Sequence, residues 1–290
     1  MEKKYKLTEE SINYCGKILY RIEALKDFGI VKKGDKGGYV EKEDNLSQEG
    51  DCWISGNAKV YDDAYVCGNV IVSDNAKVCD NALVSGNAKV YNDAEVFDNA
   101  EVYGNAIVYD YAIVCDNAIV CGNAQVFENA IVYCKTKIYG DAYVFGNAQV
   151  FDNAEVYGDA YVFGNAQVFD NAEVYGDALV YGDALVYGDA LVSGNAKVFD
   201  NAEVYGNAQV SDNAEISGSA EIKNNSDYIV FKNWWSSGRY FTWTRSNNMW
   251  KVGCFYGTGK ELIAKAYKDS ELSGREYERV VKYVESIIKQ

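Results

Sequence analysis

Hydrophobic positions recur every six residues through the middle of the chain. Every residue number divisible by six from Ile54 to Ile222 carries Val or Ile, 29 positions in all, and Ala stands four residues later in 26 of 28 cases. Side chains alternate along Ala-x-Val-Tyr as in a strand with Val and Ala pointing inward, and the Gly, Asn and Asp between units tolerate the positive φ of a tight corner. Each hexad therefore predicts one short strand and one turn.

A second period of 18 residues indicates how the hexads are arranged. The residue two places after the Val or Ile shows this period. It is Asp in six of nine cases when every third corner is taken from Asp62 on, and Gly in eight of nine cases at the next corner, from Gly68 on. Three hexads per coil make a triangular prism, because short strands that cannot bury a face alone must stack on their neighbours. The sequence predicts a mainly β protein, a parallel β-helix of nine to ten coils, roughly 45 Å long at a strand spacing of ~4.8 Å.

The two ends differ from the repeat. We expect residues 1–53 to form an N-terminal cap with a strand pair, since solenoid ends expose unpaired backbone. Residues 54–223 form the predicted hexapeptide-repeat β-helix. Residues 224–290 predict a small C-terminal βββαα domain, with three strands at 228–231, 239–246 and 249–257 and two helices at 260–270 and 273–289.

Charge is distributed unevenly along the chain. The formal net charge is −15, and residues 54–222 hold 25 acidic against 6 basic residues, a net of −19. Residues 223–290 hold 7 acidic against 12 basic residues, a net of +5. An acidic body repels nucleic acid and acidic membranes and attracts proteins with basic grooves. We therefore expect no membrane association and no direct nucleic-acid binding by the repeat, and leave nucleic-acid binding open for the C-terminal domain.

Cysteine usage and the absence of histidine limit the chemistry. The chain has eight Cys without a CxxC, and it has no His and no Pro. Cysteines that share a corner lie two or three coils apart, beyond bridging distance, so we expect free thiols, a reducing environment and a cytoplasmic location. Ser-His and Cys-His catalysis is excluded without an imidazole. We predict no enzyme activity, no catalytic residue, no cofactor and no metal site, although a Ser-Lys or carboxylate mechanism stays open.

Three stretches point to a known family. The hexad matches the left-handed parallel β-helix of bacterial hexapeptide-repeat proteins, and ALKDFG at 24–29, GDKGGYV at 34–40 and NLSQEGDCWI at 45–54 resemble the leading segment of YdcK-type and phage or prophage hexapeptide-repeat proteins. The resemblance implies a left-handed helix and a phage or mobile-element setting. Many hexapeptide-repeat proteins are acyltransferases that use a His general base, which this chain lacks.

The corner Asp row is the first candidate partner-binding surface. Its members are Asp62, Asp80, Asp98, Asp116, Asp152 and Asp170. Asp suits such a turn through a side-chain hydrogen bond to the backbone. Two further interpretations are mimicry of nucleic-acid phosphates toward a basic protein groove and weak calcium binding, the latter without a dedicated loop.

Outward apolar residues form the candidate oligomer surface. Stacked rings are expected at Phe127, Phe145 and Phe163 on one edge and at Phe151 and Phe169 on another, and outward Ile107, Ile113 and Ile119 add further apolar surface. They favour a homo-oligomer, a dimer or a trimer.

The C-terminal domain supplies the remaining candidate contacts. Aromatic residues interleaved with arginines are typical of nucleic-acid or protein contacts as well as of a small core, and the candidates are Trp234, Trp235, Arg239 and Arg245. Trp234 and Trp235 are neighbours and cannot both point inward from one strand.

These observations predict a non-catalytic acidic solenoid that binds a cytosolic protein partner, with a nucleic-acid-binding or defence protein as the most concrete target for a phage inhibitor. The alternatives are a hexapeptide-repeat acyl or sugar transferase without its usual His, a structural or self-assembling spacer, and a small-molecule sponge.

Overall fold

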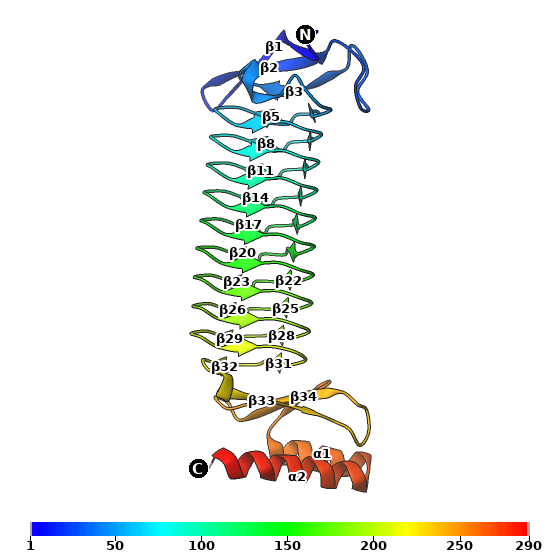
Figure 1. Ribbon diagram of the computed structural model, residues 1–290, viewed down its shortest axis with the longest axis vertical. Coiled ribbons are helices and arrows are strands. Elements are labelled where there is room, and N and C mark those ends of the chain that lie inside the picture. The colour runs from blue at the N-terminus through cyan, green and yellow to red at the C-terminus, as the bar shows by residue number, and fades with distance from the viewer. Residues whose placement is uncertain (1, 289–290) are drawn as a thin grey trace.

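The computed structural model describes residues 2–288. A parallel β-solenoid of 29 two-residue strands, β4 to β32, runs between an N-terminal cap and a C-terminal domain of four strands and two helices (Figure 1). The strands belong to three sheets, one on each side of the coil. The predicted mainly β fold, with three hexads per coil and about ten coils, is confirmed.

The ten-strand sheet contains β4 (Trp53–Ile54), β7 (Ile71–Val72), β10 (Lys89–Val90), β13 (Ile107–Val108), β16 (Gln125–Val126), β19 (Tyr143–Val144), β22 (Tyr161–Val162), β25 (Leu179–Val180), β28 (Lys197–Val198) and β31 (Glu215–Ile216). The nine-strand sheet contains β6 (Tyr65–Val66), β9 (Leu83–Val84), β12 (Glu101–Val102), β15 (Ile119–Val120), β18 (Lys137–Ile138), β21 (Glu155–Val156), β24 (Glu173–Val174), β27 (Leu191–Val192) and β30 (Gln209–Val210). The solenoid part of the thirteen-strand sheet contains β5 (Lys59–Val60), β8 (Lys77–Val78), β11 (Glu95–Val96), β14 (Ile113–Val114), β17 (Ile131–Val132), β20 (Gln149–Val150), β23 (Gln167–Val168), β26 (Leu185–Val186), β29 (Glu203–Val204) and β32 (Glu221–Ile222).

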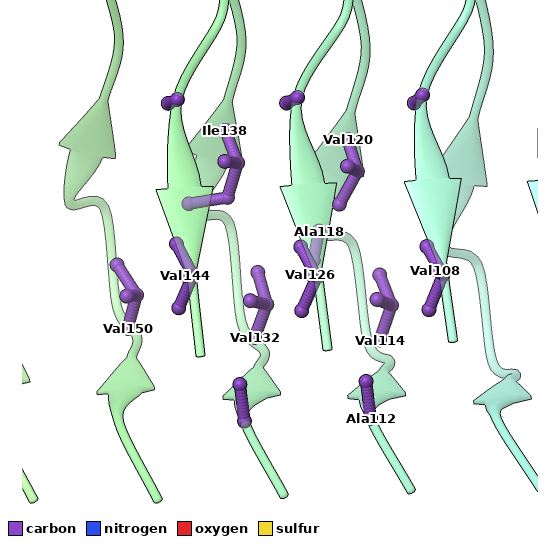
Figure 2. Packing of buried hydrophobic residues seen from close by; sticks show 14 of the residues in the cluster. Val108, Ala112, Val114, Ala118, Val120, Val126, Val132, Ile138, Val144 and Val150 are labelled. Atoms are coloured by element: carbon purple, nitrogen blue, oxygen red, sulfur yellow. The ribbon is translucent and has the colours of Figure 1, made fainter. Parts of the chain in front are cut away.

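The core is the column of Val and Ala inside the coils. Strands pair in register across 18 residues, so that Val108 lies beside Val126 and Val126 beside Val144. Their side chains point into the solenoid at successive levels (Figure 2), and each is fully buried. Thr136, which replaces Ala, is also buried, and its hydroxyl donates to the Tyr133 carbonyl at 2.8 Å. The interior is thus occupied by the packed side chains of these buried residues, and any function lies on the outer surface.

We name the turns of each coil by the sheet that precedes them: the first corner follows the ten-strand sheet, the second the thirteen-strand sheet and the third the nine-strand sheet. The second residue of a corner has positive φ, for example 58° at Asp98 and 73° at Gly104. This is the left-handed conformation expected for Gly and tolerated by Asp. The corners therefore hold the residue types that the pattern required.

The N-terminal cap continues the thirteen-strand sheet. The hairpin β1 (Tyr5–Tyr14) and β2 (Lys17–Ala24) is antiparallel, and β3 (Lys36–Val40) pairs antiparallel with β2 and parallel with β5. A short 3-10 turn covers Glu43–Asn45. Because β3 supplies the partner strand for β5, the first edge of this sheet is paired rather than open, and the expected strand pair is confirmed.

The C-terminal domain closes the other end. After a 3-10 turn at Asn225–Asp227, the antiparallel strands β33 (Tyr228–Lys232), β34 (Tyr240–Thr244), β35 (Met249–Val252) and β36 (Phe255–Gly257) precede α1 (Gly259–Asp269) and α2 (Glu271–Ile288). The last coil donates its Glu215 amide to the Thr242 hydroxyl at 2.9 Å and its Glu221 amide to the Ser246 hydroxyl at 2.7 Å. Two backbone donors at the end of the solenoid are thereby satisfied.

The predicted βββαα arrangement is wrong by one strand. Residues 249–257, expected as one strand, form a hairpin of β35 and β36, because Gly253 adopts a φ of 55° that lets the chain reverse. The two predicted helices are present, and the predicted last residue of the second, Lys289, lies outside the described residues. Among residues 2–288, no helix is both long enough and apolar enough to cross a membrane.

Candidate binding face

The ten-strand face, meaning the outer side of the ten-strand sheet, has the least charge of the three. Its outward strand residues are Trp53, Ile71, Lys89, Ile107, Gln125, Tyr143, Tyr161, Leu179, Lys197 and Glu215. Five successive positions from Ile107 to Leu179 are uncharged. The thirteen-strand face has an uncharged run of the same length, from Ile113 to Leu185, but it and the nine-strand face carry three outward glutamates each, against one on the ten-strand face. The ten-strand face therefore has the fewest strand carboxylates, and another surface can cover its band from Ile107 to Leu179 without burying one.

A column of aromatic rings runs beside these residues. Gln125 and Phe127 flank the inward Val126, so both point outward from the same strand. Successive rings of the column stack with centroids 4.8–5.0 Å apart and planes within 11° of parallel; its members are Tyr91, Tyr109, Phe127, Phe145, Phe163, Tyr181 and Phe199. Tyr143 and Tyr161 stack in the same way, at 4.8 Å. The face thus carries the seven-ring column and, beside it, one stacked pair of rings.

The stacking decides what these rings can bind. Each ring within the column has both faces covered by the rings above and below it, at 4.8 Å on either side of Phe127. The ammonium of Lys251 covers the last ring, Phe199, at 5.2 Å from its centroid. Nucleic-acid bases bind aromatic side chains by stacking on open ring faces, and the inner rings offer only their edges. The column is therefore suited to apolar packing against protein and unsuited to reading single-stranded bases.

Both ends of the ten-strand face are overhung by loops. The loop of residues 25–35, between β2 and β3, lies beside Trp53 and Ile71 at the N-terminal end. The loop of residues 233–239, between β33 and β34, brings Arg239 beside Lys197 at the other end. Both loops extend on the side of β22, β25, β28 and β31 (Figure 1). The face is consequently bounded at both ends.

The predicted oligomer residues do not form one surface. Ile107 lies on the ten-strand sheet, Ile113 on the thirteen-strand sheet and Ile119 on the nine-strand sheet. Consecutive hexads face three directions, so these side chains point away from one another. The predicted ring stacks are present: Phe127, Phe145 and Phe163 belong to the column above, and Phe151 and Phe169 stack at 4.9 Å beyond the thirteen-strand sheet.

The Asp row has a structural role at the second corner. The carboxylates of Asp80, Asp98 and Asp116 each accept a hydrogen bond from the backbone amide one coil further on, at 3.4, 3.3 and 3.1 Å. Asp170 does the same for Gly188 at 3.0 Å. Each bond joins neighbouring coils, which explains Asp at a corner where side chains stack at close range.

Two members of the row are placed differently. The carboxylate of Asp62 pairs with the Lys17 ammonium of the N-terminal hairpin. Asp152 borders a shallow recess with Lys135, which stands in the slot otherwise held by Asn or Asp. The row is thus continuous from Asp80 to Asp116 and interrupted at Cys134. Its predicted role in partner binding stays a prediction.

Asparagine side chains at the same corner of successive coils form hydrogen-bonded ladders, which the sequence analysis did not predict. At the third corner Asn69 donates to Asn87, Asn87 to Asn105, Asn105 to Asn123 and Asn123 to Asp141, at 2.8–3.0 Å. Each side-chain amide uses its nitrogen as donor and its oxygen as acceptor along one direction. The signal was available, since Asn recurs there at 18-residue intervals.

The predicted C-terminal contacts separate into core and surface. Trp234 is 73% exposed, whereas Trp235 is half-buried and packs edge-to-face on Tyr277 with centroids 4.9 Å apart. Arg239 and Arg245 are exposed on different strand ends. Phe241, Trp243 and Trp250 form the domain core. One of the two neighbouring tryptophans thus points outward, as expected from their adjacency.

Several thiols and phenols on the solenoid surface have raised pKa values. Burial raises the pKa of the Cys79 and Cys115 thiols to about 12. Burial, followed by a hydrogen bond to the Glu203 carboxylate at 3.0 Å, raises the pKa of Tyr187 to about 12. The eight cysteines are unpaired, as expected. Within residues 2–288 no three Asp, Glu or Cys side chains gather closely enough to hold a metal ion.

Comparison with known proteins supports the resemblance. A family model described as YdcK beta solenoid repeat matches residues 100–116. A curated relative named "Uncharacterized acetyltransferase YdcK", from Escherichia coli (strain K12), is 36% identical over 76 residues. The match covers 23% of this chain and 23% of the relative, so the chain spans about a quarter of that protein's length. The predicted similarity to YdcK-type β-solenoid proteins is confirmed, and the relative's name conflicts weakly with the prediction of a non-enzyme.

Proposed function

We propose that this YdcK-like β-solenoid is a non-catalytic binding protein that holds a protein partner against its ten-strand face. The observation that carries the proposal is the uncharged band from Ile107 to Leu179 beside the seven-ring column. Contiguous apolar surface of this kind marks association sites on proteins. Ring edges, rather than free ring faces, favour a partner with a packed apolar surface.

The borders of the band indicate the charge of the partner. Exposed carboxylates line the third corner at Asp141, Asp159 and Asp177, and the first corner at Glu128 and Asp183. A partner with an apolar stripe flanked by Lys and Arg matches this pattern, because the flanking charges steer association and the stripe supplies the packing energy. Proteins that handle nucleic acid present such basic surfaces, and a defence protein of a phage host is the most specific version of this proposal.

The length of the face suits one protein domain. Ten strands at ~4.8 Å span about 43 Å, which is comparable to the dimension of an interface that buries about 800 Å² per partner. The overhanging loops near Trp53 and Arg239 limit where a partner can sit. A cytoplasmic location is part of the proposal.

Matched charge insertions on two faces test the proposal. The double variant Gln125→Glu with Leu179→Glu puts two carboxylates on the ten-strand face, and Gln149→Glu with Leu185→Glu puts the same two changes on the thirteen-strand face. Tagged wild-type protein and both variants are used to capture partners from bacterial lysate at low and at roughly 0.5 M salt. We expect one protein to be retained by wild type and by the thirteen-strand variant and lost from the ten-strand variant.

Two outcomes contradict the proposal. Equal retention by both double variants removes the ten-strand face, and retention of nothing specific by wild type removes protein binding altogether. Light scattering of the same three proteins shows whether the partner is a second copy of the chain or a foreign protein. If wild type and the thirteen-strand variant are homo-oligomers and the ten-strand variant is a monomer, this face is a self-association surface. Open-ended polymers favour a spacer.

Acyl transfer is the second candidate function, because the curated relative is named an acetyltransferase. The chain has no His to act as the general base. Steady turnover of acetyl-CoA with an amine acceptor, retained by both double variants, favours this candidate over binding.

A further inference from the structure

A cavity of about 430 Å³ opens at the N-terminal end of the ten-strand face, under the loop of residues 25–35. Its lining residues are Gly29, Ile30, Val31, Asp35, Lys36, Asp51, Trp53, Ser55, Asn69 and Ile71. The volume lies in the range that holds small organic ligands. The cavity joins three parts of the chain, namely the overhanging loop, the segment before the first coil and the first two strands of the ten-strand sheet.

Hydrogen bonds within the overhanging loop fix its conformation. Phe28 and Val31 exchange backbone hydrogen bonds at 2.8 and 3.1 Å. The Asp27 carboxylate accepts from the Lys33 amide at 2.9 Å, and Asp35 accepts from the Lys32 amide at 2.7 Å. These bonds hold the loop in place without using Ile30, whose side chain is 87% exposed at the mouth of the cavity. An exposed Ile on a constrained loop is available to cover a bound molecule.

The floor of the cavity is apolar and aromatic. The Trp53 indole packs edge-to-face on Phe28 with ring centroids 5.4 Å apart, and it is 7% exposed. Val31 is buried on one side, and Ile71 is half-buried on the strand below. Apolar walls of this kind provide most of the binding energy for a small ligand, and a few polar groups then set its orientation.

The polar groups at the mouth are acidic in sum. Asp35 and Asp51 contribute two carboxylates. The single cation, Lys36, pairs with Glu10 at 2.8 Å and is thereby compensated. The Asp51 amide donates to the Asn69 side chain at 3.4 Å. The nearby Lys32 and Lys36 pair with Asp27 and Glu10, and within residues 2–288 the Asp51 carboxylate makes no ion pair. A positive charge on a ligand would be stabilised here, both by the carboxylates and by the indole.

We propose that this cavity binds a small organic cation, an aryl or alkyl group carrying an ammonium, with the apolar part on Trp53 and Ile71 and the ammonium at Asp51. The proposal goes beyond partner docking and does not depend on it, because the cavity lies under the overhang and outside the band from Ile107 to Leu179. The charge-insertion variants of that band are therefore expected to bind the cation as wild type does.

Three probes of one shape test the proposal. Phenethylammonium, 2-phenylethanol and 3-phenylpropionate are titrated into the full chain by calorimetry, with saturation-transfer NMR to follow the aromatic protons. We expect the ammonium to bind about tenfold more tightly than the alcohol, and the carboxylate to bind more weakly than both. Ile30→Ser is expected to weaken the ammonium and the alcohol by the same factor.

Asp51→Asn is the decisive variant, because it keeps the side-chain shape and removes one charge. It is expected to abolish the preference for the ammonium over the alcohol, while Glu9→Gln, an equal charge loss on exposed β1, leaves that preference intact. The proposal is overturned if no probe saturates at about 10 mM, if the alcohol equals the ammonium on wild type, or if Asp51→Asn and Glu9→Gln behave alike.

Discussion

The close contact between successive glycines at the third corner predicts that one added methyl group greatly lowers the free energy of unfolding. Gly122 has a φ of 69°, and a Cβ built there lies 2.9 Å from both the backbone N and O of Gly140 in the next coil. An L-residue in this conformation costs about 1–2 kcal/mol. Overpacking against backbone that cannot rotate away costs about 1–3 kcal/mol more. We expect Gly122→Ala to lower the free energy of unfolding by about 3 kcal/mol.

Gly16→Ala is the matched control. Gly16 has a φ of 79°, and a Cβ there meets nothing within 4 Å. This variant carries the conformational cost without the clash, so we expect a loss of about 1 kcal/mol. At about 2–4 °C per kcal/mol for domains of 150–250 residues, thermal unfolding followed by circular dichroism should separate the two variants by roughly 4–8 °C.

Equal losses in the two variants would refute the reasoning. The second corner accepts Asp98 at a φ of 58°, whereas the neighbouring Gly104 has 73°. If Gly122→Ala behaves like Gly16→Ala, the third corner has relaxed toward the Asp-type geometry, and the contact between successive Gly residues is not a constraint on the sequence.

Three further predictions concern titration and the corner ladders. A maleimide at pH 8 should label exposed Cys15 and Cys254 rapidly and Cys115 slowly, because burial raises the Cys115 pKa to about 12; equal labelling rates by mass spectrometry would contradict this. Burial raises the pKa values of thiols and phenols in the folded chain, to about 12 at Tyr187, so the unfolded chain loses these protons first as the pH rises. This contribution to stability is therefore complete below about pH 9 and is lost between roughly pH 9 and 12. Urea unfolding across this range should show the decline, and a free energy of unfolding that stays constant would contradict it. Asn105→Ala removes two ladder bonds, at 3.0 and 2.9 Å, and should cost about 1 kcal/mol, whereas no change in the urea midpoint would show that solvent replaces the ladder.

Sequence reasoning accounted for the solenoid because its stability is local and periodic. Inward Val126 and the left-handed residue at Asp98 follow from strand alternation and corner geometry, and neither needs a distant partner. The same periodicity places outward Ile107, Ile113 and Ile119 on three different faces, so these residues cannot contribute to one association surface. The missed strand β36 depends on a single positive φ at Gly253, a weaker signal than a repeat.

The sequence by itself determined the hexad register, the coil number, the inward core and the acidic character of the corners, since each is set by residues a few positions apart. Only the tertiary structure decided that the loop of residues 25–35 overhangs Trp53, that the 233–239 loop brings Arg239 to Lys197, and that Asp51 lies at the mouth of an apolar cavity. Those contacts join segments without a shared period, and their positions depend on how the cap and the C-terminal domain seat on the ends of the solenoid. The candidate cavity lies at one of these junctions, because the repeating coils resemble one another and only the aperiodic ends add distinct surroundings to them.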